Sequence, residues 1–274
     1  MKFTAVSALL ALTVLAQPSL AGNQDEEDIQ NAIFRYKAAV DTNPTNAKTR
    51  TKLGRAYLMS GDLTNAQEQF KQAIKLAPDE SEAHFGLARS LIRQGDIPAA
   101  TRSMREAVKY DPNNPDMHHR LGQLLSRPDK STNEARINEA ITEFRQALKL
   151  NPDLAGAHRD LGAALGAKGD LEGEIDEEKK ALRLAPNDPD THFYLGTAYA
   201  LTANTKEAIQ HLQRSVELDP KNPQAYQTLA GVYAADRKFS EAVKFAETAV
   251  TLAPDNQDYK KTLQKIKTAQ ANNK

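Results

Sequence analysis

The chain has 274 residues, of which 40% are hydrophobic and 26% are charged, and this mixture excludes a wholly disordered protein. Lysine and arginine together number 36, as do aspartate and glutamate, so no net charge attracts nucleic acid or an anionic membrane. Cysteine is absent, which excludes disulfides, thiolate nucleophiles and cysteine-ligated metal sites.

Residues 1–21 have the pattern of a secretory signal peptide. Lys2 is basic, the stretch from Phe3 to Ala16 is uncharged, and Ser19 and Ala21 are small residues before a cleavage point after Ala21. The uncharged stretch is shorter than the ~20 residues of a membrane-spanning helix, although an uncleaved anchor is an alternative. We therefore expect an exported chain with no integral membrane span after cleavage. An Asn-x-Ser/Thr site with x other than Pro is absent, which favours a bacterial periplasm over a eukaryotic secretory route. We expect the periplasm rather than the extracellular space.

The rest of the chain repeats itself about every 34 residues. Proline recurs at intervals of 34, 34, 40, 34, 34 and 34 residues, at Pro44, Pro78, Pro112, Pro152, Pro186, Pro220 and Pro254. A leucine and a small residue recur in step with these prolines, so the period is not an accident of composition. Each unit reads as two amphipathic helices, the first ended by a glycine turn and the second by the proline.

The unit 47–80 shows the pattern most clearly, as Leu53-Gly54-x-x-Tyr57, then Ala66-x-x-x-Phe70-x-x-Ala73 and Pro78. This pattern resembles the tetratricopeptide repeat (TPR) family. The resemblance implies an all-α fold: a right-handed α-solenoid of helix-turn-helix repeats, with about six full repeats, a half-repeat cap at each end and fourteen helices. The expected parts are a signal peptide (1–21), an N-terminal half-repeat (22–46), six repeats (47–80, 81–114, 115–154, 155–188, 189–222 and 223–256), and a C-terminal capping helix with its tail (257–274).

The N-terminal half-repeat matches only a second helix, expected over Asp28 to Asp41, with the run of acidic residues from Asp25 to Asp28 at its positive end. The third repeat carries a six-residue insertion. Pro128-Asp129 breaks its first helix, and Ser131-Thr132-Asn133-Glu134 resembles a capping box, so the second helix is expected to start at Glu134 and gain about one and a half turns. The insertion is a tolerated surface loop or a partner-specific contact.

Glu174 and Glu178 occupy positions that are apolar in the other repeats. Burial of an unpaired carboxylate is costly, so we expect Glu178 to pair with a base such as His192 or to turn toward solvent. A catalytic carboxylate pair is a weak alternative, because no nucleophile accompanies it.

Histidine stands at the fourth place of four successive repeats, as His84, His118, His158 and His192. One ring per repeat is too widely spaced for a single zinc ion, so we expect rings that fill gaps between helices and no metal site.

The resemblance also implies that the first helices line a concave groove, with the second, fifth, ninth, twelfth and thirteenth places of each repeat facing it, and candidates are taken from the fifth, ninth and thirteenth. The candidate partner-binding residues at these places are Arg55, Phe85, Arg89, Arg93, His119, Arg127, Arg159 and Phe193. Arginines beside aromatic rings favour an acidic or mixed peptide segment, because guanidinium groups bind carboxylates and stack on rings.

We therefore expect a non-enzymatic scaffold or adaptor of the cell envelope that binds a protein or peptide partner, as a monomer or within a larger complex, with no catalytic residue and no cofactor. One alternative is a glycan-binding or cell-wall-binding module in polysaccharide export, although the chain has no tryptophan to stack on sugars. A weaker alternative is an enzyme that uses Glu174 and Glu178.

Overall fold

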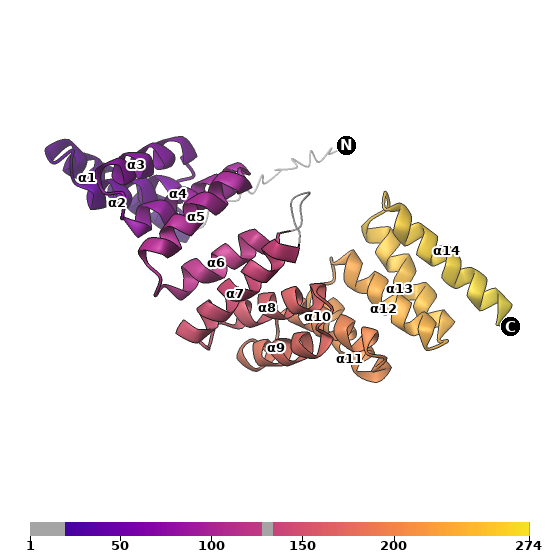
Figure 1. Cartoon of the computed structure of the whole chain (residues 1–274). Coiled ribbons are helices and arrows are strands. Elements are labelled where there is room, and N and C mark those ends of the chain that lie inside the picture. Colours follow the sequence, from indigo (N-terminus) through magenta and orange to yellow (C-terminus); the bar gives the residue numbers. More distant parts are fainter. Residues whose placement is uncertain (1–19, 128–133, 274) are drawn as a thin grey trace, which may run out of the picture. The chain divides into compact units, whose positions relative to one another are not determined.

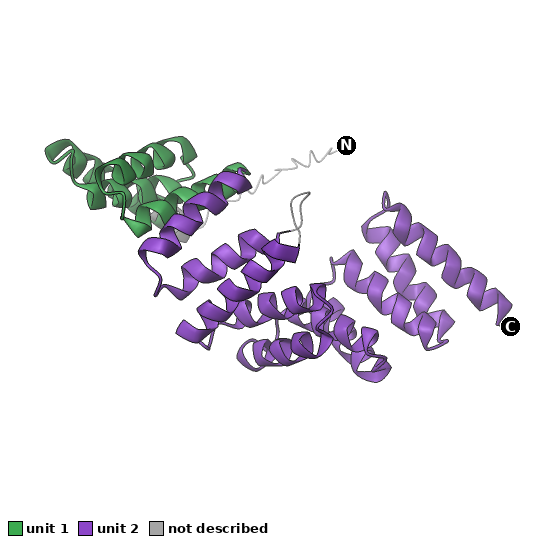
Figure 2. Ribbon diagram, viewed as in Figure 1, with its two compact units in different colours: residues 1–95 green, residues 96–274 purple. Residues whose placement is uncertain are grey.

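A computed structural model describes residues 20–127 and 134–273, with side chains from residue 25 on (Figure 1). Within these ranges the chain forms fourteen helices and no strand. It divides into two compact units, residues 1–95 and 96–274 (Figure 2). The all-α class and the number of helices agree with the sequence prediction. The expected signal peptide falls almost wholly on residues 1–19, which lie outside the described residues.

The first unit contains α1 (Leu20–Thr42), α2 (Ala47–Met59), α3 (Leu63–Leu76) and α4 (Ser81–Gln94). The prediction for α1 was wrong at its start, because the helix begins at Leu20 rather than near Asp28. No proline interrupts residues 20–28, so the helix extends back through them. The acidic run from Asp25 to Asp28 therefore lies in the second and third turns of α1, beyond the first turn where a carboxylate gains most from the helix dipole.

The second unit contains α5 (Ile97–Tyr110), α6 (Pro115–Ser126), α7 (Glu134–Leu150), α8 (Ala155–Ala167), α9 (Leu171–Leu184), α10 (Pro189–Leu201), α11 (Thr205–Leu218), α12 (Pro223–Ala235), α13 (Phe239–Leu252) and α14 (Gln257–Asn272). Helices α6 and α7, α8 and α9, α10 and α11, and α12 and α13 pack as successive hairpins. Helix α14 packs on α13, with Ile266 buried and Leu263 against the core. It thus covers the last hairpin, as predicted.

Five of the described turns that follow a first helix contain a residue with a left-handed backbone conformation. Gly61, Gly95 and Gly169 have φ values of 83°, 89° and 86°, in the region that glycine enters without steric cost. In two later turns the same conformation is held by Ala203 and Arg237, with φ values of 61° and 60°. The geometry of the turn therefore recurs even where the glycine does not.

Close packing between helices depends on small residues in the first helices, above all at the eighth place of the repeat. In the first unit, a Cβ atom added to Gly54, at the eighth place, would lie 2.8 Å from the ring of Phe70, and one added to Gly86, at the sixth place of the next repeat, would lie 2.3 Å from the same ring. In the second unit, a Cβ atom on Gly122 would lie 2.5 Å from Phe144. Both phenylalanines are fully buried, so each glycine leaves the space that a core side chain fills.

The third repeat differs from the others in the length of its second helix. Helix α7 begins at Glu134, as predicted, and has 17 residues where α9 and α11 have 14. The gain is three residues, which is less than one turn rather than the one and a half turns expected. The predicted break at Pro128-Asp129 and the other three capping-box residues, Ser131 to Asn133, lie outside the described residues.

Candidate functional site

The four repeated histidines bind the turns that precede their helices. In each repeat the histidine Nε2 atom lies within hydrogen-bond distance of the carbonyl oxygen of the proline six residues earlier: His84 to Pro78 (2.8 Å), His118 to Pro112 (3.0 Å), His158 to Pro152 (2.9 Å) and His192 to Pro186 (3.2 Å). A neutral or protonated ring donates this bond through its Nε2–H group. In the described part of the chain, no group of three or more metal-binding side chains is close enough to hold an ion. The histidines therefore fasten each turn to the helix that follows it.

In the first unit, the predicted groove residues Arg55, Phe85, Arg89 and Arg93 lie on the first helices α2 and α4. The guanidinium carbon of Arg89 lies 5.8 Å from the centroid of the Phe85 ring, a cation–π distance. Arg55 forms a loose ion pair with Glu82 (3.7 Å), and both side chains are largely exposed. Arg93 donates a hydrogen bond of 2.6 Å to the carbonyl oxygen of Leu58 and so joins α4 to α2.

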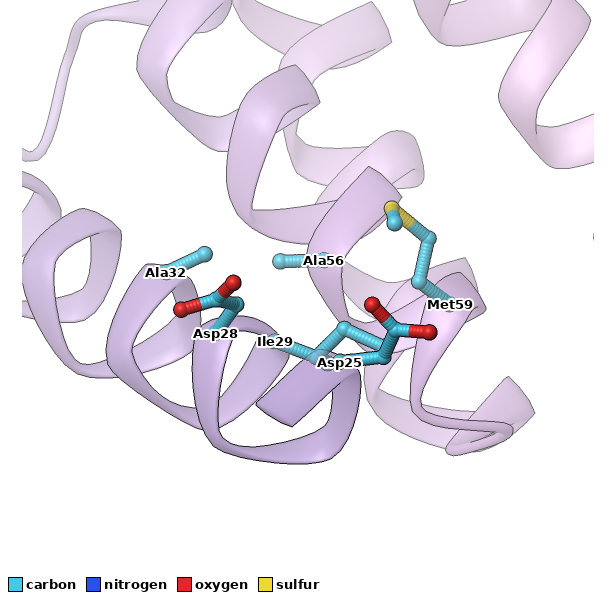
Figure 3. Close-up of a pocket in the computed structure, with 6 residues that line it drawn as sticks. All are labelled: Asp25, Asp28, Ile29, Ala32, Ala56 and Met59. Carbon is cyan, nitrogen blue, oxygen red and sulfur yellow. The ribbon is translucent and has the colours of Figure 1, made fainter. Parts of the chain in front are cut away.

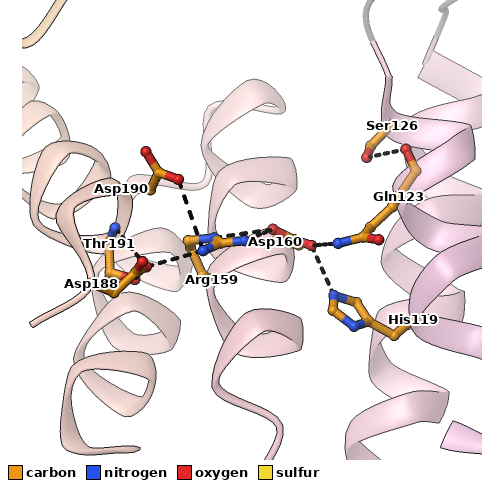
Figure 4. Close-up of polar contacts among 8 residues, drawn as sticks. All are labelled: His119, Gln123, Ser126, Arg159, Asp160, Asp188, Asp190 and Thr191. Carbon is orange, nitrogen blue, oxygen red and sulfur yellow. Dashed lines mark hydrogen bonds and ion pairs between the residues drawn. The ribbon is translucent and has the colours of Figure 1, made fainter. Parts of the chain in front are cut away.

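In the second unit, three first helices are linked by one polar network (Figure 4). His119 and Gln123 of α6 lie 2.8 and 2.7 Å from Oδ2 of Asp160 in α8. The neighbouring Arg159 bonds Oδ1 of Asp160 (3.2 Å) and Oδ2 of Asp188 (3.1 Å), the residue that caps α10. The network therefore runs from α6 through α8 to α10 and brings together His119 and Arg159, two of the predicted groove residues.

The charges of this network are held in their ionised forms. Burial alone would raise the pKa of Asp160, but hydrogen bonds from His119 and Gln123 and the charge of Arg159 outweigh it and lower that pKa. At Asp188 the bonds from Thr191 and Arg159 likewise outweigh burial and lower the pKa. Burial would lower the pKa of Arg159, and its two carboxylate partners raise it instead. The positive charge of Arg159 is thus compensated by the carboxylates of Asp160 and Asp188, so little of it is offered to a partner.

A hollow of about 510 Å³ lies beside this network, and we call it the α8 hollow. Its small, apolar wall is formed by Ala163, Ala164 and Ala167 of α8. The rest of its lining includes polar groups of α6 and α8, Ile137 of α7 and Tyr194 of α10. The hollow is large enough for a bulky side chain of a bound segment, and its polar lining can orient main-chain groups.

The remaining two predicted groove residues have different surroundings. Arg127 is exposed and lines the α8 hollow. Phe193 is only 9% exposed and packs in the core of the second unit, with its ring 5.4 Å from that of Tyr194. Its neighbour Tyr194, rather than Phe193, therefore lines the hollow.

Sequence reasoning missed Asp160, Asp188 and Tyr194, because it followed only the fifth, ninth and thirteenth places of each repeat. Asp188 carried a signal, since Asp-Pro at the start of a helix indicates an N-cap. Asp160 occupies the sixth place, and only the approach of α6 to α8 shows that it lies opposite His119.

The expectations for Glu178 were wrong. Its side chain is fully buried, and neither carboxyl oxygen has a hydrogen-bond partner. His192, the base suggested as a partner, instead has its Nδ1 atom 3.0 Å from Nδ1 of His211. Glu174 is also buried, with 6% exposure. The two carboxyl groups pack between α8 and α9, that of Glu178 against Gly162 and that of Glu174 against Gly166.

None of the helices in the described ranges is both long enough and apolar enough to cross a lipid bilayer.

Solved structures share this fold at low sequence identity. A chain of the APC/C hetero-tetramer Cut9-Hcn1 superimposes with a TM-score of 0.66 and 19% identity over 90% of this chain and 48% of its own, so the present chain spans about half of that protein. PilF of Pseudomonas aeruginosa gives a TM-score of 0.66 and 18% identity, covering 80% of this chain and 97% of that one. YrrB, described as a TPR protein with an unusual peptide-binding site, gives 0.61 and 18%, covering 69% and 95%.

Among proteins of curated function, none matches this chain. Two family models match it. The model of the cilia and flagella-associated protein 70 C-terminal domain, a TPR domain, matches residues 11–219, and a tetratricopeptide repeat model matches residues 203–266. The first match covers more than half of the chain, and the repeats, turns and hairpins described above agree with both. The chain therefore belongs to this family of tetratricopeptide repeat domains.

Proposed function

We propose that this protein is a non-enzymatic adaptor of a bacterial cell envelope that binds a segment of a partner protein on its first helices. The TPR fold supports a role in protein–protein interaction, and the family is typically non-enzymatic. The pattern of residues 1–21 supports export to the periplasm.

The α8 hollow carries this proposal. The neighbouring side chains of Asp160, Gln123 and Arg159 are held by mutual bonds, so part of the site is ordered before a partner arrives. YrrB, which has the same fold, is described as having a peptide-binding site. In the present chain, a bulky apolar side chain of the bound segment would fill the space beside Ala163 and Ala167.

The arginines of the first unit form a second contact region, suited to carboxylates of a partner. Arg55 and Arg89 remain near the surface, and the pair of Arg55 with Glu82 is too exposed and too long to hold the guanidinium strongly. The acidic character expected of the partner therefore rests on these residues and not on Arg159.

The test is an affinity capture from envelope extract, followed by a binding titration with each captured protein. Ala167→Trp fills the α8 hollow, and Ala235→Trp is its matched control, because Ala235 is an exposed alanine at the same place in α12. The proposal requires a partner whose affinity falls at least about tenfold with Ala167→Trp and stays unchanged with Ala235→Trp. Equal loss or no loss in both would overturn it.

A charge-reversal pair tests the first unit. Arg55→Glu with Arg89→Glu should weaken an acidic partner, whereas Lys71→Glu with Lys75→Glu, which reverses two exposed charges on the second helix α3, should not. Loss with the lysine pair as well would show a response to net charge alone and would remove the first unit from the site.

A further inference from the structure

Two further features of the structure lie outside the candidate site. In the first unit, a hollow of about 370 Å³ is lined in part by Ile29 and Ala32 of α1 and by Ala56 and Met59 of α2 (Figure 3). In the second unit, the hairpin of α10 and α11 holds two histidines in contact. The hairpin carries the inference, because its two rings change charge close to neutral pH.

The histidine pair stands where the neighbouring hairpins hold a histidine and a carboxylate. In the third and fourth repeats, Nδ1 of the repeated histidine lies 2.6 Å from Oε2 of Glu143 and 2.5 Å from Oε2 of Glu177. In the fifth repeat the position of these glutamates is taken by His211, whose Nδ1 atom lies 3.0 Å from Nδ1 of His192. A base thus replaces an acid, so protonation of the ring no longer forms an ion pair here.

The hydrogen bonds show how many protons the pair accepts. Nε2 of His192 lies 3.2 Å from the carbonyl oxygen of Pro186 and must carry a hydrogen to bind it, so Nδ1 of the neutral ring accepts a hydrogen bond from Nδ1 of His211. A single added proton can be shared, because one of the two rings still accepts. When both rings are protonated, neither Nδ1 atom accepts, and two like charges face each other at 3.0 Å.

The charges around the pair do not offset this repulsion. One carboxylate and one cation act on each ring: Asp188 and Arg214 on His192, and Glu207 and Lys179 on His211. Tyr199 stacks on the ring of His211, with 5.7 Å between centroids, and α12, which packs on α10 and α11, contains no charged residue. Burial lowers the pKa of both rings, and the surrounding charges do not reverse its effect.

The same hairpin has three features that favour local opening. Its turn holds Ala203 at a φ of 61°, a left-handed conformation that costs free energy for a residue with a Cβ atom. Asn204, the N-cap of α11, makes no side-chain capping bond. Ser215 of α11 is fully buried, and its hydroxyl has no hydrogen-bond partner among the described residues. Each feature lowers the free energy that opening of this hairpin requires.

We propose that the α10–α11 hairpin is an acid-sensitive element of the second unit, which opens locally when His192 and His211 are both protonated. The α6–α7 hairpin responds in the opposite direction, because protonation of His118 completes an ion pair with Glu143. Acid therefore weakens one hairpin while its counterpart in the third repeat stays closed.

Hydrogen exchange of the full chain without a partner tests the opening. The exchange of α11 amides is compared with that of α7 amides at pH 7.5 and 5.5, after correction for the intrinsic rate at each pH. A second proton taken up on opening changes the opening equilibrium up to tenfold per pH unit, so the protection of α11 should fall about tenfold at pH 5.5. That of α7 should not fall. An equal fall in both helices, or none in α11, would overturn the proposal.

Three substitutions show whether the histidine pair causes the effect. His211→Glu gives the fifth repeat the carboxylate of the third and fourth, and its α11 should lose no protection at pH 5.5. His211→Gln, which cannot ionise, should reduce the loss to less than about threefold. His158→Gln is the matched control, since it removes a repeated histidine from the fourth repeat and should leave the response of α11 unchanged. A wild-type response in His211→Glu would contradict the proposal, because groups other than this pair would then cause the opening.

The hairpin also bears on the α8 hollow, a link that rests on the proposed function. Helix α10 carries Tyr194, which lines the hollow, and its N-cap Asp188 binds Arg159. A partner bound there should hold the hairpin closed, so about ten times its Kd should restore the protection of α11 at pH 5.5 about tenfold. Opening that a bound partner leaves unchanged would refute this link alone, whereas the absence of opening in the partner-free chain would refute the acid-sensitive hairpin itself.

Discussion

The carboxyl group of Glu178 in α9 lies against Gly162 in α8, so close that a Cβ atom on the glycine would come within 2.9 Å of Oε1. In the next hairpin the same place holds an apolar contact, with Leu212 against Gly196. The two hairpins thus share their backbone approach and differ in the chemistry that fills it. The fourth repeat buries a polar group where its neighbour buries a leucine.

The burial of Glu178 has a direct electrostatic consequence. Burial raises the pKa of this carboxyl group to about 10, and the nearby Glu174 adds to the effect. Burial also raises the pKa of Glu174, to about 7. Glu178 is therefore protonated in the folded protein at neutral pH, although neither of its oxygens has a hydrogen-bond partner. Folding of the hairpin α8–α9 therefore requires this carboxyl group to take up a proton, which costs free energy at neutral pH.

Replacement of Glu178 by leucine should raise the free energy of unfolding by about 3 kcal/mol at pH 7, because it removes both the proton uptake and an unsatisfied buried group. Leucine already fills the equivalent position at Leu212, so the side chain has room. Urea denaturation followed by circular dichroism measures the change. Glu172→Leu on the exposed side of the same helix is the control and should stay within about 0.5 kcal/mol of wild type. A less stable Glu178→Leu protein would show that the carboxyl group makes a favourable contact.

The stability of the wild-type protein should fall as pH rises. A carboxyl group whose folded pKa lies above its unfolded value stabilises fully below the unfolded pKa of 4.5, and this contribution is lost as pH rises toward the folded value of about 10. Between these values Glu178 should contribute a slope of about 1.4 kcal/mol per pH unit, and Glu174 should add to it up to about pH 7. Melting temperatures measured from pH 5 to 9 should decline less steeply for Glu178→Gln, which cannot ionise. Parallel profiles would contradict a buried, titrating carboxyl group.

Two glycine-to-alanine substitutions should have opposite effects. Gly122→Ala would press a methyl group against the buried ring of Phe144 and should cost about 1–3 kcal/mol. Gly231 lies in a helix on an exposed surface, with open space where its Cβ atom would be. Gly231→Ala should therefore stabilise the helix by about 0.5–1 kcal/mol. Chemical denaturation of the two variants side by side checks the prediction, and a change of equal sign would show that packing does not set the choice of glycine.

The repeat period predicted most of the fold, because each unit restates the same amphipathic pattern. Leu53, Phe70 and Ala73 stand where the pattern requires apolar residues, and all three are buried. The start of α1 could not be predicted in this way, since the residues before Asp28 have no counterpart in another repeat. These residues are helical because no helix-terminating residue such as proline occurs among them, and the repeat period has no part in it.

Less of the candidate site than of the fold could be predicted from the sequence. The register of the family led to His119 and Arg159, but the bonds of His119 to Asp160 and of Arg159 to Asp188 connect α6, α8 and the N-cap of α10, and they become visible only when these helices are packed. The contact of each repeated histidine with the preceding turn is indicated in the sequence, because a proline precedes each of these histidines by six residues, as Pro78 precedes His84. That spacing indicates a contact between a turn and the helix that follows it.

Histidines of the same repeat position should titrate in opposite directions. A hydrogen bond of 2.6 Å to Glu143 raises the pKa of His118 above 6.5, so its stabilising contribution is complete below pH 6.5 and is lost as pH rises through the folded pKa. Burial lowers the pKa of His192, and burial together with His192 lowers that of His211, so their contribution is lost as pH falls below 6.5. Two protonated rings with their Nδ1 atoms 3.0 Å apart would also repel each other.

Imidazole NMR titration should therefore place the midpoint of His118 above 6.5 and those of His192 and His211 below it. The variant His118→Gln identifies the first signal, and the variant His211→Gln should raise the midpoint of His192. Midpoints that coincide near 6.5 would contradict the two environments, in which a carboxylate faces the ring of His118 and a second imidazole faces the buried ring of His192.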